Sequence, residues 1–445
     1  MAASSFDCVV IGSGPGGYVT AVRAAQLGMK TAVVEKDVIG GRCLNYACIP
    51  AKAVLRVADV LQEIRDADEF GISVADPTLD FGAVQARREK VIKTLTGGVA
   101  GLMKKNEVEV VEGLGTLTGG TNVKVGDREL EAKTVVLATG SVRRPIPGLE
   151  YGGKVIGTEE AWALEELPKK LVVIGAGASG TEIASAYARL GTEVTLFEGL
   201  DRVLPGEDAD ISKLAERGFK KQGITVHTKT FFDMDEHGQD ADWIVIAAGR
   251  GPDVEGLGLE AAGVKLDEAT GLIAVDGALR TSAPGIYAIG DLVPGPALAH
   301  KASDEGVIAV EDAAGLTTHP IAHVDIPRAT FCTPNVASFG LTEAQAKEAG
   351  HDVVVGKVQY GAVGAGTVYG DRSGIIKIIG DKKYGELVGG HIVGAKATEL
   401  IQELVNAKAL EGGYAEVARI IHGHPTLSEG VMEAARAADG WLIHG

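Results

Sequence analysis

The 445-residue chain is 45% hydrophobic and 23% charged, which is typical of a folded protein of about three domains and excludes a largely disordered one. Its formal net charge of −17 at pH 7 argues against nucleic acid and an anionic membrane surface as partners, because both would repel it. No apolar run approaches the roughly 18–20 residues that cross a bilayer, and no basic segment of the signal-peptide kind precedes the first apolar stretch. Four cysteines are too few for a disulfide framework. We therefore expect a cytoplasmic protein.

Two segments of the chain share one pattern. Residues 8–35 and 171–198 each contain an apolar strand, a G-x-G-x-x-G turn, an alanine-rich helix and a second strand that leads to a glutamate. The second copy follows the first by 163 positions, and the equivalent residues are Gly12 and Gly175, Gly14 and Gly177, Gly17 and Gly180, and Glu35 and Glu198. The pattern predicts two βαβ nucleotide-binding units, of which the second interrupts the first. A later strand of each unit ends in a glycine turn, at Gly140 and Gly249.

The glycines and glutamates of the two copies suit separate parts of a dinucleotide. The first glycine permits the tight turn, the second lets a pyrophosphate approach the backbone, and the third lets the helix pack closely on the sheet. The glutamate is placed to accept hydrogen bonds from ribose hydroxyls. Two such units imply two dinucleotides, FAD and a nicotinamide, and Glu198 favours NAD because it would repel a 2′-phosphate. Glycine-rich turns that bind no ligand are the alternative.

Cys43 and Cys48 lie five positions apart, directly after the first nucleotide unit. Their spacing does not fit the C-x2-C zinc knuckles, and on an ideal helix they would point about 140° apart, so a disulfide requires an irregular turn. Pro50 suits the first turn of a following helix, whose positive end, with Lys52 nearby, would lower the pKa of the Cys48 thiol. Two unrelated buried thiols are the alternative, but the place in the chain favours redox chemistry.

The remainder of the chain is organised differently. The stretch TSAPGIYAIGD (281–291) predicts a strand that closes on Asp291. From about Pro320, short strands alternate with helices and no further glycine-rich nucleotide loop occurs, which predicts an α+β domain.

Several motifs together resemble the class I flavoprotein disulfide reductases, which are pyridine nucleotide-disulfide oxidoreductases. They are GGRCLNYACIPAK, GSGPGGY, TGS, the second glycine turn with Glu182, TSAPGIYAIGD and HGHPTLSE. Within that group, GDLVPGPALAHKASDEG and FCTPNVASFGLTEAQAKEAG are most similar to the dihydrolipoamide dehydrogenases. The resemblance covers nearly the whole chain. It implies an α/β fold with two Rossmann-like domains and a C-terminal α+β dimerisation domain.

The resemblance also implies domain boundaries and partners. The FAD-binding domain would comprise residues 1–149 and 275–320, the inserted NAD-binding domain 150–274, and the dimerisation domain 321–445. A homodimer would share its active site between subunits. The protein partner would be a dihydrolipoyl acyltransferase or a lipoyl-carrier protein of a 2-oxo acid dehydrogenase or glycine-cleavage complex.

Catalytic roles follow from the same resemblance. Cys43 would be the interchange thiol, and Cys48 the thiolate held against the flavin. His424 would take a proton from a substrate thiol, with Glu429 orienting its imidazole, since a base with an ordinary pKa of about 6.5 suits a thiol of about 8.5. A metal site made of His422 and His424, or simple polar turns, are the alternatives for this tail.

Other residues would contact the cofactors. Lys52 and Glu182 would pair beneath the flavin, Asp291 would bind the ribityl chain, and residues of PALAH, including Ala299, would cover the ring. The glycines and glutamates of the two copies, with Gly140 and Gly249, complete the cofactor residues, and no resident metal is expected.

The resemblance therefore implies oxidation of dihydrolipoamide by a Cys43–Cys48 disulfide and FAD, with NAD as the acceptor. The alternatives are an NAD(P)H-dependent reductase of another disulfide or thiol substrate, and a flavin redox sensor that does not turn over. One departure concerns residues 224–250, which connect two strands of the nicotinamide domain in fewer residues than relatives use. A β-meander of that domain is expected to be trimmed.

Overall fold

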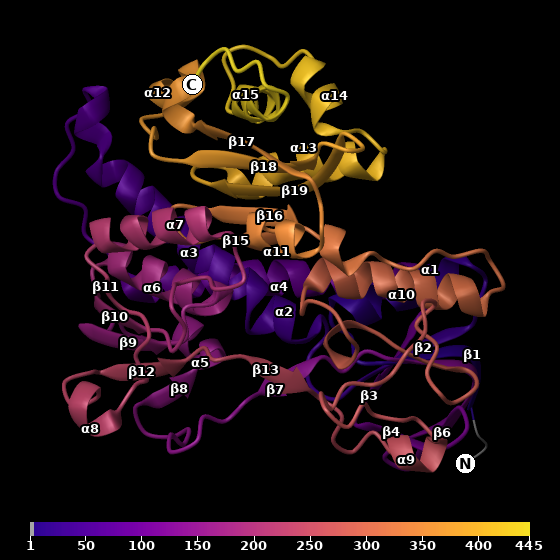
Figure 1. The fold of residues 1–445 in the computed structure, drawn as a ribbon. Coiled ribbons are helices and arrows are strands. Elements are labelled where there is room, and N and C mark those ends of the chain that lie inside the picture. Colours follow the sequence, from indigo (N-terminus) through magenta and orange to yellow (C-terminus); the bar gives the residue numbers. More distant parts are fainter. Residues whose placement is uncertain (1–3) are drawn as a thin grey trace. The chain divides into compact units, whose positions relative to one another are not determined.

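A computed structural model describes residues 4–445. They form two compact units (Figure 1). Unit 1 contains residues up to 53, residues 83–145 and residues 249–323, and unit 2 contains residues 54–82, 146–248 and 324–445.

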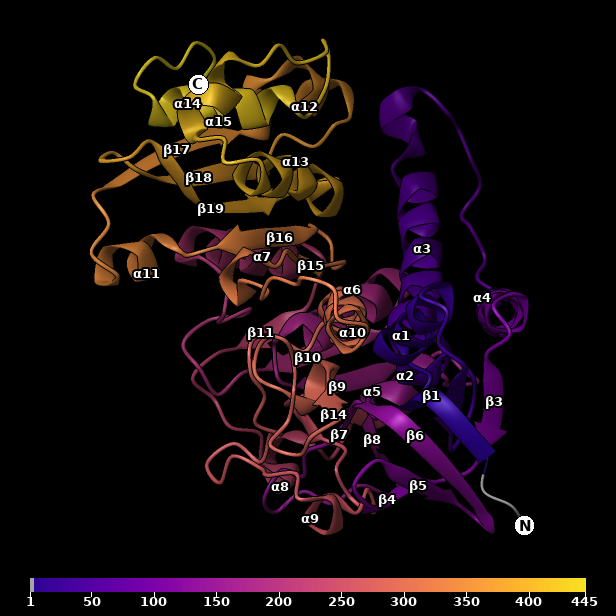
Figure 2. The ribbon, with the colours of Figure 1, turned by 90° about the vertical axis from the view of Figure 1, so that its right-hand side faces the viewer.

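Unit 1 is built on a seven-stranded sheet. Its parallel strands are β1 (Ser4–Ile11), β2 (Thr31–Glu35), β3 (Glu109–Glu112), β6 (Arg128–Leu137) and β14 (Ile286–Ala288). An antiparallel hairpin of β4 (Gly115–Gly119) and β5 (Asn122–Val125) extends the sheet beyond β6 (Figure 2). β2 is fully buried and β1 is buried over Cys8–Ile11, as expected of parallel strands covered on both faces.

Helices cover the sheet of unit 1. They are α1 (Pro15–Gln26), α2 (Gly41–Asn45), α4 (Phe81–Lys105), α9 (Leu259–Ala262) and α10 (Ala299–Ala313), with the 3-10 turn η2 (Gly290–Leu292). α3 (Cys48–Arg65) begins in unit 1 and ends in unit 2. α1 and α10 pack so closely that a Cβ on Gly306 would lie 1.9 Å from Oγ1 of Thr20. A short antiparallel pair, β7 (Ser141–Arg143) and β13 (Arg250–Pro252), joins the two segments that connect the units.

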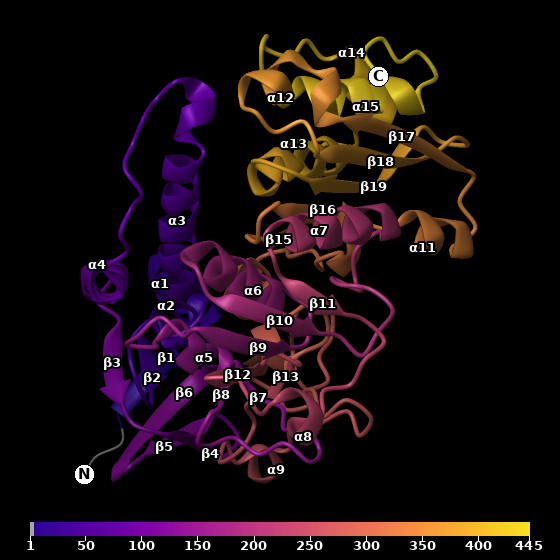
Figure 3. The same cartoon turned by 90° about the vertical axis from the view of Figure 1, so that its left-hand side faces the viewer.

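Unit 2 contains a parallel five-stranded sheet. Its order is β11 (Thr225–His227), β10 (Glu193–Phe197), β9 (Lys170–Ile174), β12 (Trp243–Ile246) and β8 (Val155–Gly157). The associated helices are α5 (Thr158–Trp162), α6 (Ala178–Leu190), α7 (Ala209–Lys221) and α8 (Met234–His237), and Figure 3 shows α6 packed against these strands. Between β11 and β12 the chain forms only α8 and no strand, so the expected meander is absent from the described connection.

The C-terminal part of unit 2 has an antiparallel sheet. Its order is β15 (Arg328–Thr330), β16 (Val336–Gly340), β19 (Glu386–Val393), β18 (Ile375–Asp381) and β17 (Val353–Gln359). Its helices are α11 (Glu343–Glu348), α12 (Gly364–Val368), α13 (Ala397–Ala409), α14 (Tyr414–Arg419) and α15 (Glu429–Ala438). The 3-10 turns η1 (Ala67–Phe70), η3 (His323–Asp325) and η4 (Tyr360–Ala362) complete the described elements. α14 and α15 cover one face, and α15 lies so close to β17 that a Cβ on Gly356 would meet the Ala434 carbonyl oxygen at 1.9 Å (Figure 1).

The predicted fold class, two Rossmann-like domains with a C-terminal α+β domain, is confirmed by these three sheets. The domain boundaries given above stay a prediction. In residues 4–445, no helix is both long and apolar enough to cross a membrane.

Candidate active site

The first glycine turn has the steric features that a pyrophosphate site needs. Gly12 has φ +103°, and a Cβ there would lie 2.4 Å from the carbonyl oxygen of Ala138. A Cβ on Gly17 would lie 1.9 Å from the Gly12 oxygen, so only glycine lets α1 approach the turn. A Cβ added to Gly14 would have no atom of the described chain within 4 Å apart from its immediate neighbours, which leaves this side of the backbone open to a ligand.

The second turn repeats this geometry. Gly175 has φ +99°, with an added Cβ 2.7 Å from the Ala247 oxygen. A Cβ on Gly180 would lie 1.9 Å from the oxygen of Gly175, and Gly177 is open like Gly14. The two turns are therefore suited to the same chemical group.

The Glu35 carboxylate is held at the end of β2 by backbone amides. Its Oε2 accepts hydrogen bonds from the Ser13 amide at 2.8 Å and the Ser13 hydroxyl at 2.5 Å, and its Oε1 accepts one from the Asp37 amide at 2.9 Å. Because Oε1 accepts only one of these bonds, its second lone pair can accept a hydrogen bond from a ribose hydroxyl.

Glu198 is held in the same way after β10. Its Oε2 accepts from the Ala176 amide at 2.8 Å and its Oε1 from the Leu200 amide at 2.9 Å. Because alanine replaces the serine of the first copy, no hydroxyl bond accompanies the amide here. Both copies thus present one fixed carboxylate beside one open glycine turn.

A polar cluster surrounds Asp291 in unit 1. The Ser141 hydroxyl donates to Asp291 Oδ2 at 2.6 Å, and the same hydroxyl oxygen accepts a hydrogen bond from Arg250 Nε at 2.9 Å. Gly140 (φ +78°) directly precedes Ser141, and Gly249 (φ +102°) directly precedes Arg250. The structure therefore brings two predicted FAD residues, Gly140 and Asp291, and one predicted NAD residue, Gly249, to one antiparallel pair.

A buried ion pair fixes the start of α10 to the segment of Asp291. Lys301 and Glu305, each 1% exposed, lie 3.0 Å apart. Lys301 Nζ donates to the Gly290 oxygen at 2.9 Å, and the Gly290 amide donates to Glu305 at 2.7 Å. Burial raises the pKa of Glu305 despite the cation. The sequence-based prediction named Ala299 here and missed this pair, although a Lys and a Glu four positions apart in a helix were its signal.

The two cysteines meet at a break between helices. α2 ends at Asn45, Tyr46 has φ −128°, and α3 begins at Cys48. The Cys43 thiol is hydrogen-bonded to Cys48; this bond, followed by burial, raises the pKa of Cys43 above its ordinary value. The side-chain amide of Asn45 donates to the carbonyl oxygens of Ile39 and Gly41 at 3.0 and 2.9 Å, which holds the irregular turn in place.

The cysteine turn packs on the first nucleotide turn. A Cβ on Gly41, the first residue of α2, would lie 2.7 Å from Cα of Gly14. The paired thiols therefore belong to the same site as the open Gly14 backbone. This contact brings the two thiols close to the predicted dinucleotide site.

Lys52 and Glu182 fall in different units. Lys52 lies in the first turns of α3, and Glu182 is buried in α6, where its Oε1 accepts a hydrogen bond from the Phe331 amide at 2.9 Å. Their pairing beneath a flavin stays a prediction.

The C-terminal tail presents an oriented imidazole. His424 Nδ1 is 2.9 Å from Glu429 Oε1, and the Thr426 amide donates to Oε2 at 2.8 Å. Burial opposes ionisation of Glu429, but the Thr426 amide and His424 outweigh it and lower its pKa. The His424 side chain is 76% exposed, so its second nitrogen faces outward from this subunit.

The neighbouring His422 has a different environment. Its Nε2 is hydrogen-bonded to Glu403, its Nδ1 lies 2.9 Å from the Ile420 oxygen, and its side chain is 5% exposed. Both ring nitrogens are therefore occupied, which argues against a metal pair with His424. In the described part of the chain, no three His, Cys, Asp or Glu side chains are grouped to hold a metal.

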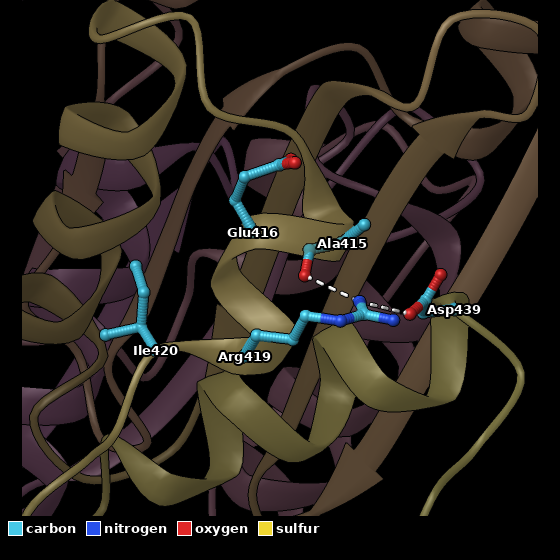
Figure 4. A pocket seen from close by; sticks show the side chains of 5 residues that line it. All are labelled: Ala415, Glu416, Arg419, Ile420 and Asp439. Carbon is cyan, nitrogen blue, oxygen red and sulfur yellow. Dashed lines mark hydrogen bonds and ion pairs between the residues drawn. The ribbon is translucent and has the colours of Figure 1, made fainter.

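A shallow hollow of about 500 Å³ lies elsewhere in the C-terminal domain (Figure 4). Its lining includes Arg419, whose Nη1 donates to the Ala415 oxygen at 3.0 Å and to Asp439 at 2.7 Å. None of the predicted site residues lines it.

Comparisons with known families assign both parts of the chain. Residues 6–306 match the profile described as pyridine nucleotide-disulphide oxidoreductase. Residues 326–435 match the dimerisation domain of the same family.

Individual relatives agree with this assignment. The chain is 42% identical over 474 residues to a dihydrolipoyl dehydrogenase of Bacillus subtilis, covering 99% of this chain and all of the relative. It is 44% identical to one of Chlorobaculum tepidum, over 97% of each chain. Because the first alignment is longer than this chain, that relative contains positions that this chain lacks.

Solved structures share the fold. LpdA from Mycobacterium tuberculosis gives a TM-score of 0.89 at 28% identity, covering 97% of this chain and 99% of that one. The HOCl-induced flavoprotein disulfide reductase RclA from Escherichia coli, in its Cu(II) complex, gives 0.86 at 26% identity, with the same coverage.

Proposed function

Since the chain belongs to the pyridine nucleotide-disulphide oxidoreductase family, we propose that it is a dihydrolipoyl dehydrogenase that uses FAD and NAD. The observation that carries the proposal is the thiol pair Cys43 and Cys48, packed through Gly41 on the open turn of Gly14. Relatives that match this chain over 97–100% of their own length bear the name of this activity.

The reaction balances through these thiols. A Cys43–Cys48 disulfide accepts two electrons when the substrate dithiol attacks Cys43, forms a mixed disulfide, and then closes its own ring with release of both protein thiols. Bound FAD would take the electron pair from the reduced thiols and pass it as hydride to NAD. The net products are the cyclic disulfide, NADH and one proton.

The remaining residues of the chain bind and move protons. His424 accepts the proton of the substrate thiol, and Glu429 stabilises the imidazolium through the 2.9 Å contact. In a homodimer the base would be supplied to the thiols of the opposite subunit. The match to a dimerisation domain supports this arrangement.

The two glycine turns would hold the two cofactors. Gly12, Gly14, Gly17 and Glu35, with Gly140, Asp291, Ala299 and Lys52, would bind FAD. Gly175, Gly177, Gly180 and Glu198, with Gly249, would bind NAD, and Glu182 would pair with Lys52. The open glycines and fixed carboxylates of both copies support this assignment.

The setting of the enzyme is also a proposal. It would act in the cytoplasm on a lipoyl group carried by a dihydrolipoyl acyltransferase or a lipoyl-carrier protein. The second candidate function is reduction of another disulfide. The structural likeness to RclA, a flavoprotein disulfide reductase, supports this candidate.

The test follows NADH formation from dihydrolipoamide and NAD with purified FAD-loaded protein, and uses NADP as the parallel acceptor. Rapid NADH formation that is lost in Cys48→Ser and strongly reduced in His424→Gln supports the proposal. Absence of turnover by a flavin-loaded wild-type protein would refute it, and consumption of NADH with another disulfide would then support the second candidate.

A further inference from the structure

The shortened connection between β11 and β12 lies where a nucleotide is expected. β10 and β11 are parallel, so Glu198 and residues 228–233 follow their carboxyl ends at one edge of the sheet. Dinucleotides bind at this edge in open α/β sheets. The inference below rests on the proposed NAD site and concerns which residue of this chain recognises the adenine.

Phe231 covers the residue that follows Glu198. Its ring carbon Cε1 lies 2.9 Å from the position that a Cβ on Gly199 would take, so the absence of a side chain there lets the ring approach. Phe231 is nevertheless 84% exposed, so little of its side chain is covered by the described chain. The ring therefore touches the segment after Glu198 at one point and is otherwise open.

Backbone hydrogen bonds hold this loop against the Glu198 segment. The Lys229 amide donates to the Leu200 oxygen at 2.7 Å, and the Thr230 amide donates to the Glu198 oxygen at 3.0 Å. Lys229 adopts φ +53°, which turns the chain so that Phe231 follows directly after these bonds. The backbone that carries Phe231 is thus held next to the Glu198 segment.

An aromatic cluster supports the loop from within. Phe197, the last residue of β10, stacks on His227 with centroids 4.9 Å apart and packs edge-on against Phe232 at 5.5 Å. His237 of α8 lies 4.7 Å from the same ring. Phe232 therefore packs inward, and its neighbour Phe231 is turned outward at the edge of the sheet.

We propose that Phe231 is the platform on which the adenine ring of NAD stacks while Glu198 binds the ribose. Adenine is bonded to that ribose, so it must lie close to the carboxylate. Phe231 presents an exposed aromatic ring at this place. Any nucleobase has a face that can stack on an aromatic ring, and such stacking contributes about 1–3 kcal/mol per base. The platform belongs to the shortened segment.

The experiment measures binding of ADP-ribose, which carries the adenosine half of NAD without nicotinamide, to the FAD-loaded enzyme. Phe231→Ala is expected to raise its dissociation constant roughly tenfold, and Phe231→Tyr to restore it. Gly199→Ala is expected to weaken binding too, because its methyl group displaces the ring. Tyr384→Ala is the matched control, since Tyr384 is an aromatic residue 72% exposed in a hairpin turn, and should bind normally.

Reduction of the bound flavin by dihydrolipoamide is the second readout, because this half-reaction needs no NAD. It should be unchanged in all four variants, which also shows that they fold. Equal affinity of Phe231→Ala and wild type for ADP-ribose would overturn the inference. Failure of wild type to be reduced by dihydrolipoamide, with the binding differences intact, would refute the proposed function and leave the adenine platform supported.

Discussion

Replacement of Lys377 by methionine is expected to destabilise unit 2. Lys377 projects from β18 and is 3% exposed, and its Nζ lies 2.9 Å from Asp208, 3.0 Å from Asp210 and 2.8 Å from Glu343. Asp208, at 4% exposed, is its only fully buried partner; Asp210 and Glu343 reach solvent. Methionine fills the space but leaves the Asp208 charge uncompensated.

The magnitude follows from this burial pattern. Breaking a buried ion pair by removing one partner costs about 3–5 kcal/mol, and the lower figure applies because solvent screens the two exposed partners. A loss of about 3 kcal/mol corresponds to a fall in Tm of roughly 6–12 °C for a unit of this size. Lys357→Met is the matched control: Lys357 also contacts Asp210, at 3.3 Å, but its side chain is 49% exposed, so less than about 1 kcal/mol is expected.

The pH dependence gives the sharper assay. Burial opposes ionisation of Asp208, but the hydrogen bond and charge of Lys377 lower its pKa below the ordinary 3.8. In wild type the stabilisation from ionised Asp208 is therefore present above pH 3.8, and it is lost only as the pH falls through the lowered pKa of Asp208. Without Lys377, burial is opposed only by the smaller effects of His391 and the Glu343 amide, so the pKa of Asp208 rises relative to wild type. Protonation of Asp208 therefore relieves the variant at a higher pH.

The Tm difference between wild type and Lys377→Met should accordingly be largest near neutral pH and shrink towards about pH 4. The measurement is thermal unfolding of both FAD-loaded proteins across this range. A variant as stable as wild type at neutral pH, or a gap that grows on acidification, would refute the reasoning.

Three further outcomes are expected. The Gly17→Ala variant should lose visible flavin absorbance and have a lower apoprotein Tm, because its Cβ would lie 1.9 Å from a carbonyl oxygen. The Gly14→Ala variant should bind flavin more weakly but keep the apoprotein Tm of wild type. Equal apoprotein Tm values for the two variants would contradict this. Glu429→Gln should lower kcat for dihydrolipoamide oxidation by about 10- to 100-fold, less than the loss on removing the base itself, and a wild-type steady-state rate would be inconsistent with an oriented base. Lys301→Met should release FAD more readily than wild type, since it leaves Glu305 buried without its cation; an unchanged flavin dissociation constant would count against this positioning role.

Most of the features that the sequence predicted are fixed by local contacts. At positions 17 and 180 the requirement for glycine comes from a carbonyl oxygen five residues earlier, so the motif itself carries that geometry. At positions 12 and 175 it comes from the carbonyl oxygens of Ala138 and Ala247, which follow the adjacent strands β6 and β12. The irregular turn at Cys43 and Cys48 follows similarly from the short interval between two helices. His424 and Glu429 lie five residues apart and meet across one helix start.

The features that it missed depend on distant parts of the chain. Lys377 meets Asp208 across 169 positions, and Ser141 meets Asp291 across 150, so no spacing in the sequence indicates either contact. Phe231 had a weak signal, two adjacent phenylalanines in a loop, but only the fold shows that one packs inward and the other lies over Gly199. Tertiary packing, rather than local propensity, decides these positions.

The paired amide contacts of Glu35 and Glu198 have a consequence for how the enzyme meets its nucleotides. A glutamate side chain loses up to about 1.5–2 kcal/mol of rotamer entropy when it is held in one conformation. Here both carboxylates are already immobilised by backbone amides in the protein alone, so this loss accompanies folding and not association. A ribose bound at either proposed site would therefore meet a rigid carboxylate, and a larger part of that contact would contribute to affinity.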